Sequence, residues 1–134
     1  MKKINDRITE FDLNNDEGDI RLAANFKVKE FACKDGSSTV LIDSALVEVL
    51  QKMRIFLKRP IIITSGYRTK SYNKKINGAQ NSYHCKGMAA DIRVDGVDNS
   101  MLSCCAMLCG ATGIGIYKDF IHIDTRDDYT LWEN

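Results

Sequence analysis

The sequence predicts a single-domain α+β protein of 134 residues. Segments with helical periodicity precede and separate short β-branched runs, and two late runs are divided only by a tight turn, which indicates a hairpin. Apolar residues form 44% of the chain and charged residues 28%, as in ordinary globular domains. A chain of this length buries about two-thirds of its unfolded surface, enough for a hydrophobic core.

The first predicted helix lies between Asp43 and Pro60. Asp43 is a suitable N-cap, and Pro60, the only proline, ends the helix because it cannot continue the hydrogen-bond pattern. The β-branched run over residues 61–64 predicts a buried strand. The apolar stripe of the helix at helical spacing consists of Leu46, Leu50, Met53 and Leu57.

The second half of the chain predicts two more helices and three more strands. Glycine follows the last helical stretch, as is common at helix C-termini. In chain order we expect a short helix over residues 69–76, a loop over 77–81, a strand over 88–94, a helix from Asp98 or Asn99 to Cys109, and strands over 114–117 and 120–124.

The N-terminal residues differ in character from the rest. Residues 1–25 include a polar, turn-rich stretch and are predicted to be a peripheral segment, with the domain proper over residues 26–134. The N-terminus has no apolar core of a signal peptide, so we expect synthesis in the cytoplasm and another delivery route, such as lysis or a virion, for action outside the cell.

Charge and cysteine content exclude several classes of protein. A formal net charge of +1 gives no electrostatic case for nucleic acid or an anionic membrane, and no apolar stretch approaches the ~20 residues of a membrane-spanning helix. Five cysteines without a secretion signal argue against a disulfide framework. We expect a monomer.

The chain has only two histidines, and their surroundings suit a zinc site. His84 precedes Asp91 by seven positions, and His122 lies in a predicted strand. Two imidazoles and a carboxylate would supply three ligands and leave one position for water, as catalytic zinc requires. Because residues two apart share one face of a strand, Asp91 and His122 can face one cleft. A thiolate from Cys85 would instead close the site and make it structural.

Several motifs occur in a fixed order around these residues. Together they resemble the zinc D-alanyl-D-alanine carboxypeptidase family, which includes peptidoglycan carboxypeptidases, vancomycin-resistance dipeptidases and phage endolysin peptidases of the L-alanyl-D-glutamate type. The resemblance runs from about residue 26 to about residue 126. The motifs are Ser65-Gly66-Tyr67-Arg68, Asn73, Gly78-Ala79, Ser82-x-His84-x-x-Gly87-x-Ala89-x-Asp91, Gly113-x-Gly115-x-Tyr117 and Phe120-x-His122-x-Asp124.

The resemblance implies a small antiparallel sheet with flanking helices, a hedgehog-like fold, and an active-site groove across the sheet. It implies that the zinc ligands are His84, Asp91 and His122. Arg68 matches an arginine near the substrate, where it would hold a carboxylate or polarise the scissile carbonyl. Ser82 matches a substrate-contacting serine. From the residues alone, Arg68 could equally form a structural ion pair, and Ser82 could be only a turn residue.

The general base has two candidates. Several family members carry an acidic residue three positions before the last histidine ligand, which is Asp119 here. Others carry a histidine two positions before that ligand, where this chain has Phe120. Asp119 is therefore the expected base, although aspartate also favours turns. Asp124 is the second candidate, and it would share a strand face with His122 and could instead orient that imidazole.

The sequence therefore predicts a zinc metallopeptidase, a carboxypeptidase or endopeptidase that hydrolyses peptidoglycan stem peptides or cross-links. The small format fits a phage-type lysis enzyme acting on the cell wall. One alternative is a zinc-containing module of the same fold that binds the cell wall without catalysis. The other is a structural protein without metal. The bond that is cleaved stays open at this level.

Overall fold

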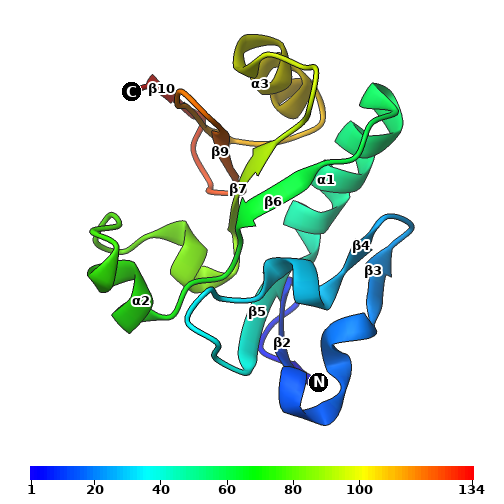
Figure 1. Cartoon of the computed structure of the whole chain (residues 1–134), viewed down its shortest axis with the longest axis vertical. Helices are drawn as coiled ribbons and strands as arrows, with labels where there is room; N and C mark the ends of the chain where they lie inside the picture. Colours follow the sequence, from blue (N-terminus) through cyan, green and yellow to red (C-terminus); the bar gives the residue numbers. More distant parts are fainter.

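The computed structural model describes all 134 residues, which form three α-helices, ten β-strands and four short 3-10 helices (Figure 1). None of its helices has the length and hydropathy needed to cross a membrane. The α-helices are α1 (Ser44–Leu57), α2 (Lys70–Lys75) and α3 (Asn99–Leu108). The strands are β1 (Lys2–Lys3), β2 (Ile8–Asp12), β3 (Arg21–Ala23), β4 (Phe26–Lys27), β5 (Thr39–Asp43), β6 (Ile62–Ser65), β7 (Ala89–Arg93), β8 (Gly113–Ile116), β9 (Ile121–Asp124) and β10 (Thr130–Glu133).

The main sheet has five strands in the order β10-β8-β9-β7-β6. The four strands from β6 to β8 pair antiparallel, and β8 and β9 form the expected hairpin. The expectation of a wholly antiparallel sheet is wrong at one edge, because β10 pairs parallel to β8. After β9 the chain crosses past β8 before it enters the sheet, so β10 runs in the same direction as β8. The sheet is therefore mixed.

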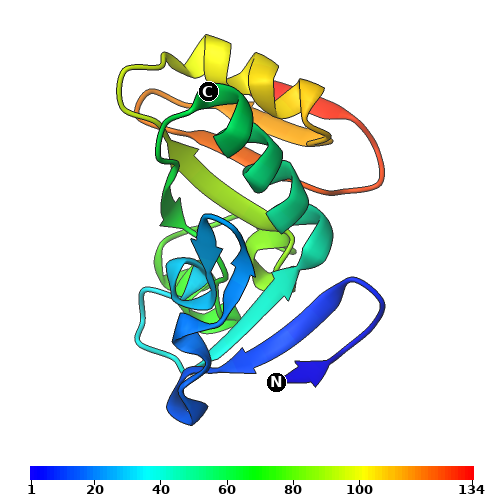
Figure 2. The ribbon, with the colours of Figure 1, turned by 90° about the vertical axis from the view of Figure 1, so that its right-hand side faces the viewer.

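Helix α3 packs on β8 and β9, and α1 lies beside α3 on the same side of the sheet (Figure 2); one core cluster joins both helices to the sheet. On β7 and β9, alternate residues point into this core. The buried residues that the two strands contribute to it are Ala90, Ile92, Ile121 and Ile123. Asp91 and His122, which alternate with them, therefore point to the opposite face, away from α1 and α3.

The predicted helix starts are confirmed by their capping hydrogen bonds. The Asp43 carboxylate accepts from the backbone N–H of Ala45 at 3.0 Å and begins α1. Of the two candidates for α3, Asp98 is the N-cap, since its carboxylate accepts from the N–H of Met101 at 2.8 Å. Asn99 is already in the helix, where its side chain is free to make contacts elsewhere.

Residues 1–25 contact the rest of the protein at several places, including β2, and β3 pairs with β4. Strand β2 pairs antiparallel with β5 along its whole length, and the side chains of Ile8 and Phe11 are buried. Arg7 donates to the buried carboxylate of Asp43 at 2.6 Å and to the backbone carbonyl of Thr125, directly after β9. The domain boundary at residue 25 stays a prediction, but these contacts tie the first residues to the end of β9.

Two glycines of β8 leave space for the larger side chains of neighbouring strands. A Cβ atom at Gly113 would overlap the carboxylate of Asp124, and one at Gly115 would lie 2.6 Å from Cζ2 of Trp132. Trp132 in turn packs against His122, with 5.3 Å between the ring centroids. The Gly-x-Gly spacing of β8 is therefore required by the side chains beside His122.

We expect Gly115→Ala to destabilise the protein by about 1–3 kcal/mol, because the added methyl group must displace a packed indole ring. The midpoint of urea unfolding measures this. Gly18→Ala is the matched control, since its Cβ would meet the flexible end of Leu13 at 3.3 Å and Cβ of Lys29 at an ordinary contact distance of 3.5 Å. Equal midpoints for the two variants would show that Trp132 moves aside at no cost.

Candidate metal centre and active site

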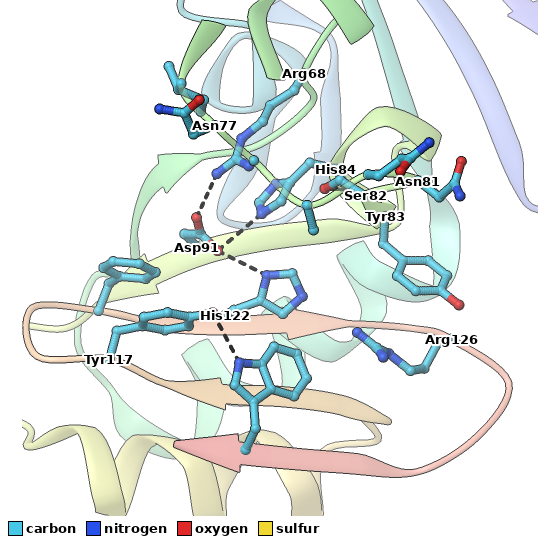
Figure 3. Close-up of a pocket in the computed structure, with 16 residues that line it drawn as sticks. Arg68, Asn77, Asn81, Ser82, Tyr83, His84, Asp91, Tyr117, His122 and Arg126 are labelled. Carbon is cyan, nitrogen blue, oxygen red and sulfur yellow. Dashed lines mark hydrogen bonds and ion pairs between the residues drawn. The ribbon is translucent and has the colours of Figure 1, made fainter. Parts of the chain in front are cut away.

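Three candidate ligands predicted from the sequence meet on the open face of the main sheet (Figure 3). Asp91 on β7 and His122 on β9 are directly paired in the register of these strands. His84 comes from a 3-10 helix over residues 83–86 that precedes β7. Ser82 caps this helix, and its hydroxyl accepts from the N–H of His84 at 3.2 Å. The three ligand atoms lie within 4.8 Å of one another.

The hydrogen bonds of the two histidines determine which nitrogens carry protons. Nδ1 of His84 lies 2.7 Å from the carbonyl oxygen of Gly66, so it must donate, and Nε2 of the neutral ring has a lone pair. Nε2 of His122 lies 2.7 Å from the buried carboxylate of Asp124, so its Nδ1 has the lone pair. Both lone pairs point at Oδ1 of Asp91, at 3.1 Å each. Three acceptors converge, which requires a proton or a cation between them.

The donor set and its spacing suit zinc. Tetrahedral zinc with bonds of about 2.0–2.1 Å separates its ligand atoms by about 3.3 Å, close to the observed spacing from the carboxylate to each imidazole. The contacts behind the ligands are of the kind found in zinc enzymes, where a carbonyl and a carboxylate fix the imidazole tautomers. Cys85 is not part of this cluster. The residues present therefore fit a metal ion with His₂Asp coordination.

Electrostatics keep the acidic ligand ionised. Burial alone would raise the pKa of Asp91, but hydrogen bonds from His122 and His84 outweigh it and hold this pKa well below its ordinary value. Burial would likewise lower the pKa of His122, but its bonds to Asp124 and Asp91 raise it above the ordinary value. The raised pKa of His122 favours a proton between its Nδ1 and Asp91, and metal binding would compete with that proton.

Arg68 contacts the metal ligand set directly. Its Nη2 donates to Oδ2 of Asp91 at 3.0 Å, which leaves Oδ1 as the oxygen that faces the histidines. Its Nε and Nη1 donate to Ser65 and Asn73 at 3.0 and 3.1 Å. The structure thus shows the structural ion pair that the sequence left open. Arg68 also lines the cleft, so its predicted contact with substrate stays a prediction, as does that of Ser82.

The two candidate bases lie in different surroundings, and neither side chain lines the cleft. Asp119 is exposed in the turn between β8 and β9, and Asn99 donates to the carbonyls of Tyr117, Lys118 and Phe120 around it. Asp124 is fully buried behind His122. Burial would raise the pKa of Asp124, but hydrogen bonds from His122 and Arg126 hold it well below its ordinary value. Asp124 therefore occupies the place of a residue that orients His122.

The ligands line a cleft of about 540 Å³. Sequence reasoning missed several side chains in its wall, among them Tyr83, Arg126 and Trp132. Trp132 is the only tryptophan, and its indole N–H donates to the hydroxyl of Tyr117 at 3.0 Å. A single tryptophan in the chain was the one available signal, but only the parallel pairing of β10 with β8 brings it to the cleft.

We expect Asp124→Asn to weaken zinc binding and activity by roughly 10- to 100-fold, the usual cost of losing a partner that orients a metal-bound histidine. The Asn amide can present an N–H to Nε2 of His122 and favour the wrong tautomer. Equilibrium competition with a chelator and kcat/KM measure the two losses. Asp128→Asn, an exposed position in the loop after β9, is the control and should change neither quantity. An unchanged zinc affinity in Asp124→Asn would contradict the orienting role.

The chain is similar to proteins of known family. The model of the peptidase M15 family matches residues 24–124, a range that contains all three candidate ligands. The peptidoglycan L,D-endopeptidase MepK of Escherichia coli (strain K12) is 33% identical over 93 residues, which cover 63% of this chain and 51% of that protein. The Probable peptidoglycan L,D-endopeptidase MepK of Haemophilus influenzae is 39% identical over 72 residues, 48% of this chain and 39% of that protein.

The chain thus spans about half or less of the length of these curated relatives. The family match, by contrast, extends over three-quarters of the chain, from just before β4 to the end of β9. It therefore includes both strands of the metal centre and the helix that carries His84. On this evidence the chain belongs to the peptidase M15 family.

Proposed function

We propose that this protein is a zinc-dependent endopeptidase that hydrolyses an internal bond of peptidoglycan stem peptides or cross-links. The observation that carries the proposal is the convergence of two imidazole lone pairs on one carboxylate oxygen, at 3.1 Å each, in a cleft. The names of the MepK relatives support peptidoglycan as substrate and an endopeptidase over a carboxypeptidase. The site of action would then be the cell wall.

In this proposal the chain's residues bind, orient and exchange protons. His84, Asp91 and His122 hold the zinc ion through the three atoms described above. When bound, zinc supplies a Lewis acid for the scissile carbonyl and lowers the pKa of a water molecule. Arg68 keeps one oxygen of Asp91 turned toward the metal position, and Asp124 keeps Nδ1 of His122 unprotonated.

Proton transfer is assigned to Asp119 in this proposal. A peptidase of this kind needs a carboxylate that accepts a proton from water and gives it to the leaving amine. Asp124 already accepts from His122 and Arg126 and is shielded from solvent, so it is poorly placed for exchange. Asp119 is exposed and lies between two cleft residues, Tyr117 and Phe120, so substrate binding can bring it to the reaction site.

The test compares metal-free and zinc-loaded protein on two substrates. The first is a cross-linked peptidoglycan fragment, and the second is a stem peptide that ends in D-alanyl-D-alanine. We expect the zinc-loaded protein to cleave the internal bond of the first, with products identified by mass spectrometry, and the chelated protein to cleave neither. Release of only terminal D-alanine would instead identify a carboxypeptidase.

The same samples test the metal. Zinc at 100 times its dissociation constant should stabilise the fold by about 2.7 kcal/mol, because it binds only the folded ligand set. Magnesium serves as the control, since it binds poorly to imidazole. No zinc retention and no stabilisation would contradict a metal centre.

One structural observation favours a second function. Neither Asp119 nor Asp124 lines the cleft, as would be expected of a module that binds cell-wall peptide and zinc without catalysis. That function predicts zinc-loaded protein that sediments with insoluble peptidoglycan and releases no product. Cleavage of either substrate excludes it.

A further inference from the structure

Arg126 forms part of the cleft wall beside the metal centre and has no assigned role in the proposed reaction. It lies two residues after the end of β9, and its side chain is 21% exposed. Its guanidinium carbon lies 4.6 Å from the ring centroid of Tyr83 and 5.1 Å from that of Trp132. Figure 3 shows the side chain extending toward His122. Two aromatic rings and the neighbouring strand therefore hold the guanidinium in one orientation.

Only one edge of this guanidinium is used within the protein. Nε donates to the carboxylate oxygens of Asp124 at 2.9 and 3.1 Å, and Nη2 donates to one of them at 2.6 Å. Nη1 has no acceptor in the protein, and Nη2 has a second N–H available. The outer edge, formed by Nη1 and Nη2, is therefore free to bind a second planar acceptor.

The other arginine of the cleft, Arg68, has fewer free hydrogen-bond donors than Arg126. All three nitrogens of Arg68 already donate to protein acceptors, on Ser65, Asn73 and Asp91. Figure 3 shows Arg68 and Arg126 on different sides of the two histidines. Arg68 retains one free N–H on each of Nη1 and Nη2, whereas Nη1 of Arg126 donates to no protein acceptor, so an anionic group beside the metal centre meets more free donors at Arg126.

We propose that Arg126 binds a carboxylate of the substrate peptide through Nη1 and Nη2 and makes the enzyme selective for peptides with an acidic group near the scissile bond. A guanidinium matches a carboxylate with two parallel hydrogen bonds, which is stronger and more directional than a lysine contact. The preset orientation reduces the entropy lost on binding. This inference rests on the proposed peptidase function and adds the chemistry that the substrate must carry.

The experiment uses the zinc-loaded protein and a peptide that it cleaves. Each free carboxylate of this peptide is converted singly to a carboxamide, which removes the charge and keeps the shape. For one of these derivatives we expect wild-type kcat/KM to fall roughly tenfold to a hundredfold, mostly through KM, as for loss of a charged hydrogen bond. In Arg126→Gln the ratio between the acid and the amide should fall to about 1.

The ratio separates substrate binding from a structural role. Loss of Arg126 also removes a partner of Asp124, and this lowers activity on both peptides equally, so it cancels in the ratio. Arg126→Lys should keep a weaker preference, because it retains charge without the paired donors. Arg93→Gln is the matched control. It removes an arginine that also pairs with an aspartate two residues away but lies outside the cleft, so the full wild-type ratio should persist.

Each outcome either supports or contradicts the role of Arg126 in substrate binding. Wild-type protein that cleaves the acid and every amide equally overturns the inference and leaves the peptidase function intact. A full wild-type ratio in Arg126→Gln also overturns it. If Arg126→Gln does not fold, a full ratio in Arg126→Lys overturns the paired contact. Zinc-loaded wild-type protein that cleaves no peptide overturns the proposed function, and the inference with it.

Discussion

Asp91→Asn is expected to remove the bound metal and reduce peptidase activity to background. The loss should exceed the roughly 10- to 100-fold cost of losing an outer partner of a metal ligand, because Asp91 is the one anionic ligand. Neither orientation of the new amide is satisfactory. Its NH₂ group faces either the donor of Arg68 or the lone pairs of the two histidines, and the latter orientation leaves no oxygen for zinc.

Zinc content by atomic emission and kcat/KM measure this result. Asp95→Asn is the matched control, since Asp95 lies two residues after the end of β7, is exposed and pairs only with Arg93 at the surface. Loss of such an exposed pair changes stability by about 0–1 kcal/mol, so metal and activity should be unaffected. One zinc per chain in Asp91→Asn would show that this carboxylate is not a ligand.

The same variant should alter the response of the metal-free fold to acid. The pKa of Asp91 in the folded protein lies below its ordinary value, so the ionised carboxylate stabilises the fold at neutral pH. This contribution is lost as the pH falls below about 4, the ordinary pKa of an aspartate. Asparagine binds no proton in this range. The free energy of unfolding in urea should therefore decline less steeply between about pH 5 and pH 2 in Asp91→Asn than in wild type.

Asp119→Asn is expected to lower kcat/KM by roughly 10²- to 10⁴-fold, the contribution of a positioned general base, with zinc content unchanged. Zinc content and kcat/KM of the zinc-loaded wild type and variant are measured at one fixed pH, so that loss of the base is separated from loss of the metal.

Asp128→Asn again provides a control, as a second exposed aspartate next to the same sheet. It should leave both kcat/KM and the zinc content unchanged. If Asp119→Asn keeps wild-type activity, proton transfer belongs to another group. A zinc-binding protein that cleaves nothing in either form would favour the binding module.

Much of the local structure follows from the sequence because its signals are local. Asp43 and Asp98 cap helices by hydrogen bonds that span two or three residues, and the helical and β-branched patterns place α1, β6, β7 and the β8–β9 hairpin. Strand alternation also puts Asp91 and His122 on one face, and their direct pairing across β7 and β9 confirms it. These features need only neighbouring residues or one strand register.

The features that the sequence did not reveal depend on distant segments. β2 and β5 are short and pair across about thirty residues, and the contact of Arg7 with Asp43 and Thr125 joins three separate parts of the chain. β10 joins the sheet in parallel, which no local pattern indicates. Burial shows the same limit, because the adjacent Cys104 and Cys105 have identical side chains, yet α3 leaves the first exposed and buries the second.

The sequence alone determined the candidate ligands, since the chain has only two histidines and an ordered set of motifs around them. The tertiary structure decided what each neighbouring polar group does. It turned Arg68 toward Asp91, buried Asp124 behind His122 and brought Arg126 and Trp132 to the cleft. The physical reason is that ligand identity is a property of residue type, whereas hydrogen-bond partners and burial depend on how distant strands pair.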